Sequence, residues 1–422
     1  MLTGVKPFKE NKHGSVPYGM AHQSKVANYA VASVLALFLV GAPAHLFLSQ
    51  LSVVNLVSVL VIAAFLSRIR RLRFGVAGWV CVALFAVYVL CAAIAVSYSF
   101  NDENIRVLRG TLVSAASVML GGGVIWRFKR TVIDGALISV MILAVVGCVL
   151  QMTFLFYGVG LDPAINDQFV LGESSGGLAF GLRSFFTNPN DLSVFGALCL
   201  LYFSLSRQHL WWCGATLSFL LVVLGGSRAA LVVGMIVVFS VLISRPWRLL
   251  LFSLSMAGVV FGIMAIGTGE KWYVVARVED LFQVFNSGLS VDGSLSLRYE
   301  SFIYFLSHYG LFLVPSFDAS LPFHAFRDAS FDSGLVSRSP HNFLIELHGL
   351  FGGVGLVIFV TFGFLVLNKL GRRYGWVIAS VVFVFLCFLT AVPSSFVNFH
   401  QFFFLVSLMC RSSDWAKHSE FR

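Results

Sequence analysis

Long apolar runs recur along most of this chain, and they limit what it can fold into. Several approach or exceed about 18 mostly apolar residues, close to the roughly 20 that an α-helix needs to cross a bilayer. Lipid offers no hydrogen-bond partners to the backbone, so such runs must fold as helices. Of the 422 residues, 58% are hydrophobic and only 11% are charged, too few to cover a soluble protein of this length. The sequence therefore predicts an all-α polytopic membrane protein.

About twelve membrane-spanning helices are expected from these runs. Their predicted ranges are 28–46, 49–67, 75–97, 108–126, 132–157, 191–206, 211–225, 229–244, 249–267, 341–367, 376–392 and 396–410. The predicted connectors include an acidic segment, 98–106, and the longest loop, 268–340. Two parts of that loop, about 272–285 and 295–313, have apolar residues at helical spacing, which predicts amphipathic helices on the membrane surface.

The charged residues indicate how the chain threads the membrane. Most of the 29 Lys and Arg crowd the connectors on one side, as in RIRRLR (68–73), and most of the 19 acidic residues fall on the other side. Cytoplasmic loops are enriched in Lys and Arg, so the basic side is the inner one. Both termini are then cytoplasmic and the loop 268–340 is external. The net charge of +10 therefore needs no nucleic-acid partner.

This threading divides the chain into consecutive regions. They are a basic cytoplasmic tail, 1–26; N-terminal transmembrane helices, 27–210; a central region that contains the long loop, 211–367; C-terminal transmembrane helices, 368–410; and a second cytoplasmic tail, 411–422. All seven cysteines lie within apolar runs, and none has the spacing of a metal site. We therefore expect neither a disulfide framework nor a bound metal.

Three arginines on the outer side stand out by their surroundings. Arg183 lies in GLRSFFTNPND, among turn-forming residues just before a helix, and Arg228 lies between two apolar runs in GGSRAAL. Arg298 lies on the second amphipathic segment. Each alone is more often a structural anchor, but three on one side of a membrane suggest an anion site. A lipid-linked phosphate or pyrophosphate is the natural ligand there, since arginine binds phosphate oxygens bidentately. Asn188 and Asn190, in the same TNPND turn, are candidate substrate contacts.

The stretch SPHNFLIELHGLFGG places a histidine where the chain re-enters the membrane after the long loop. His341 is a candidate general base, because histidine has an unperturbed pKa of about 6.5; the alternative is a helix-start histidine bonded to backbone. Asn342 follows it and could hold a sugar hydroxyl. His348 is seven residues further on and shares the helix face of His341, whereas Glu346 does not share that face. Both are supporting candidates.

These motifs, in this order, resemble those of the O-antigen ligase and O-antigen polymerase superfamily. The resemblance is carried by GLRSFFTNPND, GGSRAAL and PHNFLIELHGLFGGVG, the last two flanking a ligase-related region within 211–367. It implies a GT-C-type glycosyltransferase of the bacterial inner membrane with a periplasmic active site. The enzyme would transfer a glycan from undecaprenyl pyrophosphate to a sugar hydroxyl, without a metal or other cofactor. It further implies that Arg183, Arg228 and Arg298 bind the pyrophosphate and that His341 deprotonates the acceptor.

The acceptor is left open by the motifs. A polymerase would transfer the glycan to the next lipid-linked repeat unit, which we favour slightly, and an O-antigen ligase would transfer polymer to lipid A–core. A flippase or transporter of lipid-linked sugars could hold pyrophosphate with the same arginines, but the inverted repeat typical of many transporters is not evident. The expected partners are the lipid-linked donor, either acceptor, membrane lipids, and a chain-length regulator or flippase.

Overall fold

The structure is a computed structural model of the whole chain. It describes residues 76–98, 102–121, 130–156, 189–205, 211–238, 343–376 and 400–419, with short pieces at 32–33, 35, 39, 58–63, 100, 173–174, 177–178, 184, 186, 303, 379–380 and 382–383.

Helices make up almost all of the described part. They are α3 (Val76–Tyr98), α4 (Asp102–Met119), α5 (Arg130–Phe156), α7 (Pro189–Leu205), α8 (Trp211–Gly225), α9 (Arg228–Val237), α14 (Phe343–Tyr374) and α16 (His400–Ser419). A minimal antiparallel hairpin, β1 (Glu173–Ser174) with β2 (Gly177–Leu178), lies between α5 and α7. The predicted all-α class is confirmed. The predicted helix 249–267 and, apart from the helical Ile303, the amphipathic segments of the long loop lie outside the described residues.

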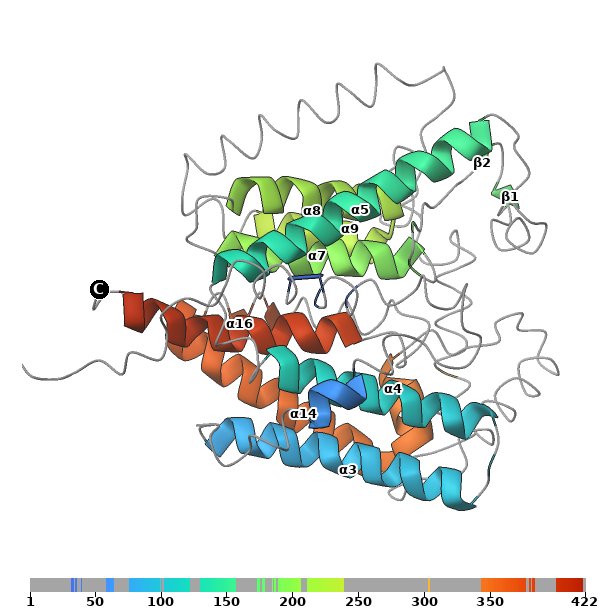
Figure 1. The fold of residues 1–422 in the computed structure, drawn as a ribbon, viewed down its shortest axis with the longest axis vertical. Helices are drawn as coiled ribbons and strands as arrows, with labels where there is room; N and C mark the ends of the chain where they lie inside the picture. Colours follow the sequence, from blue (N-terminus) through green and yellow to red (C-terminus); the bar gives the residue numbers. More distant parts are fainter. Residues whose placement is uncertain are drawn as a thin grey trace, which may run out of the picture.

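The helix α16 lies between two groups of helices (Figure 1). Helices α5, α7, α8 and α9 form one group, in which α7 packs along α8 and also contacts α9. Helices α3, α4 and α14 form the other, in which α3 contacts both α4 and α14. Helix α16 contacts α7 from the first group and both α4 and α14 from the second. It therefore joins the two groups.

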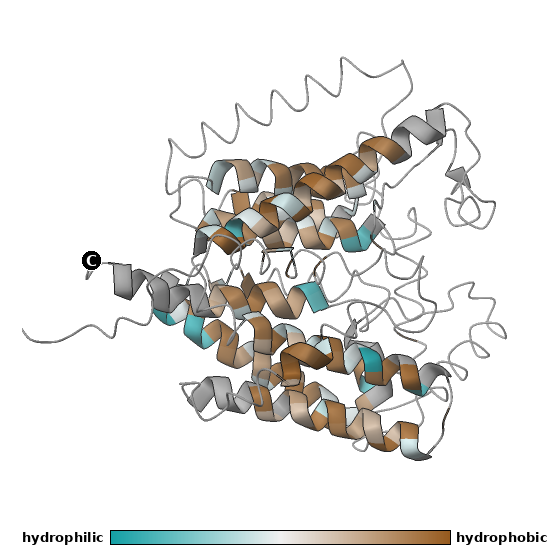
Figure 2. Ribbon diagram, viewed as in Figure 1, coloured by the Kyte–Doolittle hydropathy of each residue, from teal (hydrophilic) through white to brown (hydrophobic). Residues whose placement is uncertain are grey.

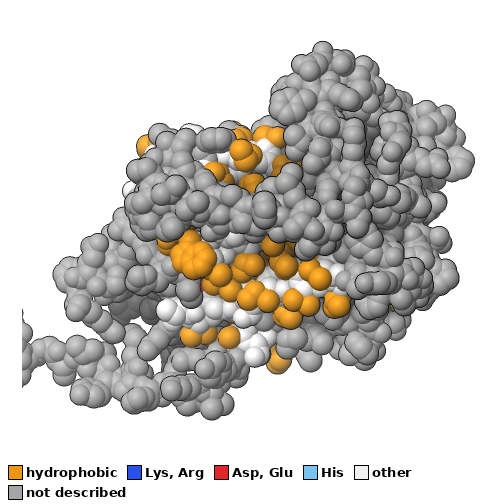
Figure 3. All heavy atoms as spheres, turned by 90° about the horizontal axis from the view of Figure 1, so that it is seen from above, with side chains coloured by type: hydrophobic (Ala, Val, Ile, Leu, Met, Phe, Trp, Pro, Cys, Tyr) orange, Lys and Arg blue, Asp and Glu red, His pale blue; other side chains and the backbone are white. Residues whose placement is uncertain are grey.

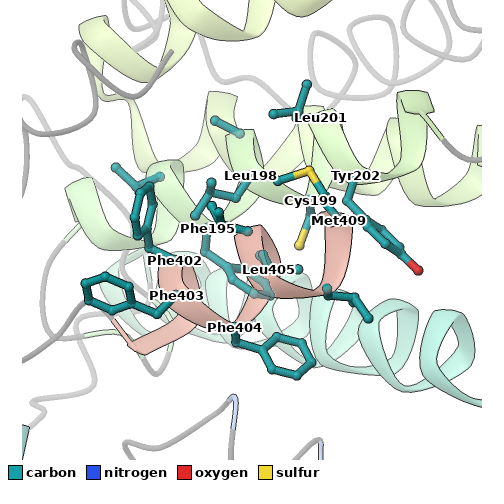
Figure 4. Close-up of a cluster of buried hydrophobic side chains, with 14 of the residues drawn as sticks. Phe195, Leu198, Cys199, Leu201, Tyr202, Phe402, Phe403, Phe404, Leu405 and Met409 are labelled. Carbon is teal, nitrogen blue, oxygen red and sulfur yellow. The ribbon is translucent and has the colours of Figure 1, made fainter. Parts of the chain in front are cut away.

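The core is centred on α7 and α16. Residues 192–204 of α7 and residues 402–409 of α16 are all buried, so no side of either stretch faces the outside. In Figure 4, Phe402 of α16 lies on the side of α7, toward Phe195 and Leu198, whereas Phe404 points away from α7. On the other side, the Phe403 ring lies edge-on to Phe85 of α3, 5.0 Å between centroids, and to Phe362 of α14, 5.8 Å. A helix that is apolar and buried all round is the centre of its bundle.

The outer faces of the bundle are apolar too. On α5 the exposed side chains include Ile142, Val146 and Leu150, each about half exposed, and on α14 Val357 and Val360 are two-thirds exposed. Figure 2 shows brown, hydrophobic residues along the outer helices, and the described side chains visible in Figure 3 are hydrophobic or uncharged. A soluble protein would carry charge on such faces.

Among the residues that the structure describes, two stretches are long and apolar enough to cross a membrane, Thr131–Leu150 and Phe351–Arg372. The first, with 20 residues, would extend about 30 Å, the thickness of the hydrocarbon core. Together with the apolar outer faces, these stretches support a membrane location.

Several predicted helix ends were wrong. Helix α4 begins at Asp102, inside the predicted loop 98–106, and ends at Met119. The acidic residues DE form its first turn, where the positive end of the helix dipole favours them, and the Asn104 amide closes the turn by donating to the Ala95 carbonyl at 3.2 Å.

Two more helices are longer than predicted. Helix α14 continues past 367 to Tyr374, and α16 continues past 410 to Ser419, so basic residues taken as connectors are helical. Long basic side chains can extend from a helix end toward water, so they need not end it. By contrast, the predicted helix 211–225 coincides with α8.

We expect Val360→Asp to lower the amount of membrane-integrated protein. Val360 is near the middle of the span Phe351–Arg372 and 65% exposed, and Asp at the centre of a membrane helix opposes insertion by about 2.5–3.5 kcal/mol. The readout is the fraction retained in membranes after an alkaline carbonate wash, with Val360→Leu as control. Equal retention of the Asp and Leu variants would contradict a lipid-facing position.

Candidate functional site at one end of the bundle

The last three residues of the TNPND motif, Pro189, Asn190 and Asp191, form the beginning of α7. Pro189 is the first helical residue, a position that tolerates proline because its N–H would have no partner within the helix. Asp191 lies in the first turn, where an acidic residue is favourable. Asn190 is the second helical residue and is partly buried. The predicted candidate Asn190 therefore lies at the N-terminus of a core helix.

The GGSR motif forms the turn between α8 and α9. Gly226 has a φ of 65°, in the left-handed region that favours glycine, and its N–H donates to the Val222 carbonyl at 3.2 Å. Ser227 is the N-cap of α9, and its hydroxyl accepts the Ala230 N–H at 3.5 Å. Arg228 is the first residue of α9. The two glycines end one helix, and the serine starts the next.

One serine joins these two motifs. The Ser193 hydroxyl donates to the Val222 carbonyl at 3.2 Å and accepts the Ser227 N–H at 3.1 Å. Ser193 and Ser227 are both buried. The start of α7 and the turn before α9 are therefore held together, although 34 residues separate the two serines.

The segment before α7 is seated against the same group of helices. Ser184 has a φ of 53°, unusual for a residue other than glycine, and its hydroxyl lies against Gly147 of α5, where a side chain would collide with it. The buried Phe186 ring lies 5.3 Å from that of Phe195 in α7. Ser184 therefore lies against α5, and Phe186 lies against α7.

The first part of α14 is set off by a kink. Gly352 has a φ of 61° and interrupts the helix, so Phe343–Phe351 forms a short piece before the long span. The Tyr88 hydroxyl of α3 donates to the Gly355 carbonyl at 2.5 Å, and its ring lies 4.8 Å from that of Phe351. This short piece contains Glu346 and the buried His348.

The structure describes only some of the predicted site residues, and their roles stay predictions. Asn190 and the backbone of Arg228 lie at the same end of the bundle, where Ser193 bonds to Ser227. His348 is buried in α14, which is linked to α7 through α16. For Arg228 and Glu346 only the backbone is described. The predicted residues outside the described part of the chain are Arg183, Asn188, Arg298, His341 and Asn342.

The opposite end of α7 carries a polar pair that the sequence did not single out. The Tyr202 hydroxyl donates to a carboxylate oxygen of Asp134 at 2.7 Å, and both side chains are buried. Asp134 lies near the start of α5 and Tyr202 near the end of α7, so the two helices run antiparallel. Charge threading places both of these ends on the inner side, which stays a prediction.

Ser193 was also missed. It lies among apolar residues in a helix, and nothing local marks its partner. Ser227 carried a weak signal, because Gly-Gly-Ser before an apolar run is typical of a helix end followed by an N-cap. The signal that could have found Ser193 is the fixed packing of α7 on α8, which the sequence alone does not give.

Residues of both charges lie at this end, because Asp191 is in the first turn of α7 and Arg228 begins α9. Helices α7 and α9 both begin here, and a helix N-terminus carries N–H groups without intrahelical partners and about half a positive charge. Two such ends beside an arginine can bind phosphate oxygens. Among the described residues, no three His, Cys, Asp or Glu side chains are grouped as metal ligands.

No family model matches the sequence, and no curated protein matches it. The resemblance to the O-antigen ligase and polymerase superfamily therefore depends on the three quoted motifs.

Gly196→Ala is expected to destabilise the protein by about 1–3 kcal/mol, as overpacking does. A Cβ there would lie 2.7 Å from the Ser218 carbonyl oxygen and 2.9 Å from the Val222 nitrogen, which are backbone atoms of α8. The control is Gly135→Ala, where a Cβ meets nothing within 4 Å. Ala is the better helix former by up to about 1 kcal/mol, so the control should melt no lower than the parent. A melting temperature that rises for Gly196→Ala in detergent would contradict the close approach of α7 and α8.

Proposed function

We propose that this chain is a membrane glycosyltransferase. It transfers a glycan from undecaprenyl pyrophosphate to a sugar hydroxyl on the periplasmic face of the bacterial inner membrane. The observation that carries the proposal is the contact of Ser193 with Ser227, which joins two of the three motifs at one end of the bundle. The packing of α7 along α8 brings the start of α7 to the turn before α9, and the bonds of Ser193 fix the two there.

The anion to be bound is the leaving group. Arg228 is the first residue of α9 and Asn190 is in the first turn of α7, so the N-termini of two helices lie at this end, and the proposal assigns the Arg228 guanidinium to the pyrophosphate. The resemblance adds Arg183 and Arg298, and Arg183 directly precedes Ser184, which is seated on α5. Pyrophosphate is already a good leaving group, and its developing charge is stabilised by these groups.

The reaction needs one proton transfer. His341 takes the proton from the acceptor hydroxyl, and the resulting oxygen attacks the anomeric carbon of the donor sugar. The bond from that carbon to the pyrophosphate oxygen breaks, and undecaprenyl pyrophosphate leaves with the electron pair. Asn342 and Asn188 position the sugars, while Glu346 and His348 support the beginning of α14, which follows His341 in the sequence.

We propose that the acceptor is the next lipid-linked repeat unit, which makes the enzyme an O-antigen or exopolysaccharide polymerase. The test uses purified protein in liposomes, with undecaprenyl-pyrophosphate-linked oligosaccharide extracted from source-strain cells that lack this chain. Growth of the glycan with donor alone supports a polymerase. Transfer only after lipid A–core is added indicates a ligase, and movement of the donor across the bilayer without a new glycosidic bond indicates a transporter.

His341→Ala should abolish glycan transfer in this assay, because no other group would remove the acceptor proton. The variant should still insert in the membrane and keep the parent's melting temperature. His418→Ala is the control, since that residue lies in the predicted cytoplasmic tail. Normal transfer by the His341 variant would exclude its role as the base.

Arg228→Lys is expected to slow transfer at least tenfold, because an ammonium group cannot reproduce the bidentate guanidinium contact. Arg207→Lys, just beyond the other end of α7, should leave the rate unchanged. Initial rates with the same donor preparation provide the measurement. A near-normal rate for Arg228→Lys would show that only a positive charge is needed.

A further inference from the structure

Ser193 differs from Ser117 and Thr361, two other hydroxyl residues within helices of this bundle, in where its hydrogen bonds go. The Ser117 hydroxyl donates to the Val113 carbonyl at 2.8 Å, and the Thr361 hydroxyl to the Val357 carbonyl at 2.7 Å, each within its own helix. This is the usual arrangement for Ser and Thr in apolar helices. Ser193 bonds instead to the end of α8 and to the start of α9.

The bond from Ser193 to α9 supplies a hydrogen-bond acceptor that the N-terminal cap of α9 lacks. In a capping box, the N-cap hydroxyl accepts the N–H of the third helical residue, and that residue's side chain accepts the N-cap N–H in return. Ser227 makes the first bond, to the Ala230 N–H. The second cannot form within α9, because residue 230 is alanine. Ser193 of α7 supplies the missing acceptor to the buried Ser227 N–H.

We infer that Ser193 is a positioning residue that fixes the first turn of α9, and with it Arg228, against the N-terminus of α7. The two bonds of its hydroxyl set both the distance and the rotation of one helix start relative to the other. The consequence for catalysis depends on the proposed function, in which Arg228 and the start of α7 bind the leaving pyrophosphate. Displacement of such a group by about 1 Å can slow a reaction about a hundredfold.

The central comparison is between Ser193→Ala and Ser117→Ala. Both remove a hydroxyl from a buried serine in a helix, but only the first breaks a contact between helices. With the donor extract described above, Ser193→Ala should lower kcat about tenfold or more and change KM for the donor less than about threefold. Ser117→Ala should leave both constants near those of the parent. Ser193→Thr, which keeps a hydroxyl, should recover most of kcat.

Two further measurements separate positioning from a general structural effect. Amide hydrogen exchange at residues 227–230 should become faster in Ser193→Ala, but not in Ser117→Ala. In addition, the double variant Ser193→Ala with Arg228→Lys should be about as slow as the slower single variant, because both act through the same contact.

Failure of the proposed function and failure of the positioning role of Ser193 would give different experimental results. If the parent transfers no glycan, the proposed function fails, and hydrogen exchange alone still decides whether Ser193 holds the start of α9. If the parent is active, the positioning role is overturned by unchanged exchange at 227–230. It is equally overturned by a kcat loss no larger than in Ser117→Ala, by multiplying losses in the double variant, or by a Thr variant no better than Ala.

Discussion

The burial of α16 on every side is the constraint on which the described structure depends. A stretch with eight consecutive buried residues must be covered all round, and α4, α7 and α14 provide that cover. In lipid, apolar surface alone gives little drive for helices to associate, so packing and hydrogen bonds must hold them. The edge-on contacts of Phe403 with Phe85 and Phe362 are of this kind, and such aromatic pairs contribute about 0.5–1.5 kcal/mol each.

Hydrogen bonds then fix the rotation and register of α7, which packing leaves less constrained. Packing against α16 limits the distance of α7 from its neighbours but constrains its rotation and register less. Ser193 bonds to α8 and α9 at one end of α7, and Tyr202 bonds to Asp134 of α5 near the other. Polar groups buried in a membrane protein are costly without partners, so a small slip of α7 would be opposed at both ends. The start of α7 is therefore one of the best-fixed points of the candidate site.

Local sequence signals predicted a helix end correctly where turn-forming residues mark it, and they failed where no such residues do. Helix α8 was predicted with its exact bounds, because Gly225-Gly226-Ser227 marks its end. The start of α4 was missed because acidic residues were taken to mean loop, although they also suit a first helical turn. The site divides in the same way. Arg228 was predicted from its motif, whereas Ser193 was not, since its partner is distant in sequence and its role exists only after α7 and α8 have packed.

The position of Arg228 opposes the usual distribution of charge along a helix. Basic residues are favourable at C-termini, and at an N-terminus the helix dipole opposes them by about 0.3–1 kcal/mol. Yet Arg228 is the first residue of α9, at the same end of the bundle as the N-terminus of α7. Sequences break such local rules mainly at functional sites. A bound anion would make the position of Arg228 favourable, because both helix ends and the guanidinium would attract the anion. Local instability without a ligand and affinity for pyrophosphate would then have the same cause.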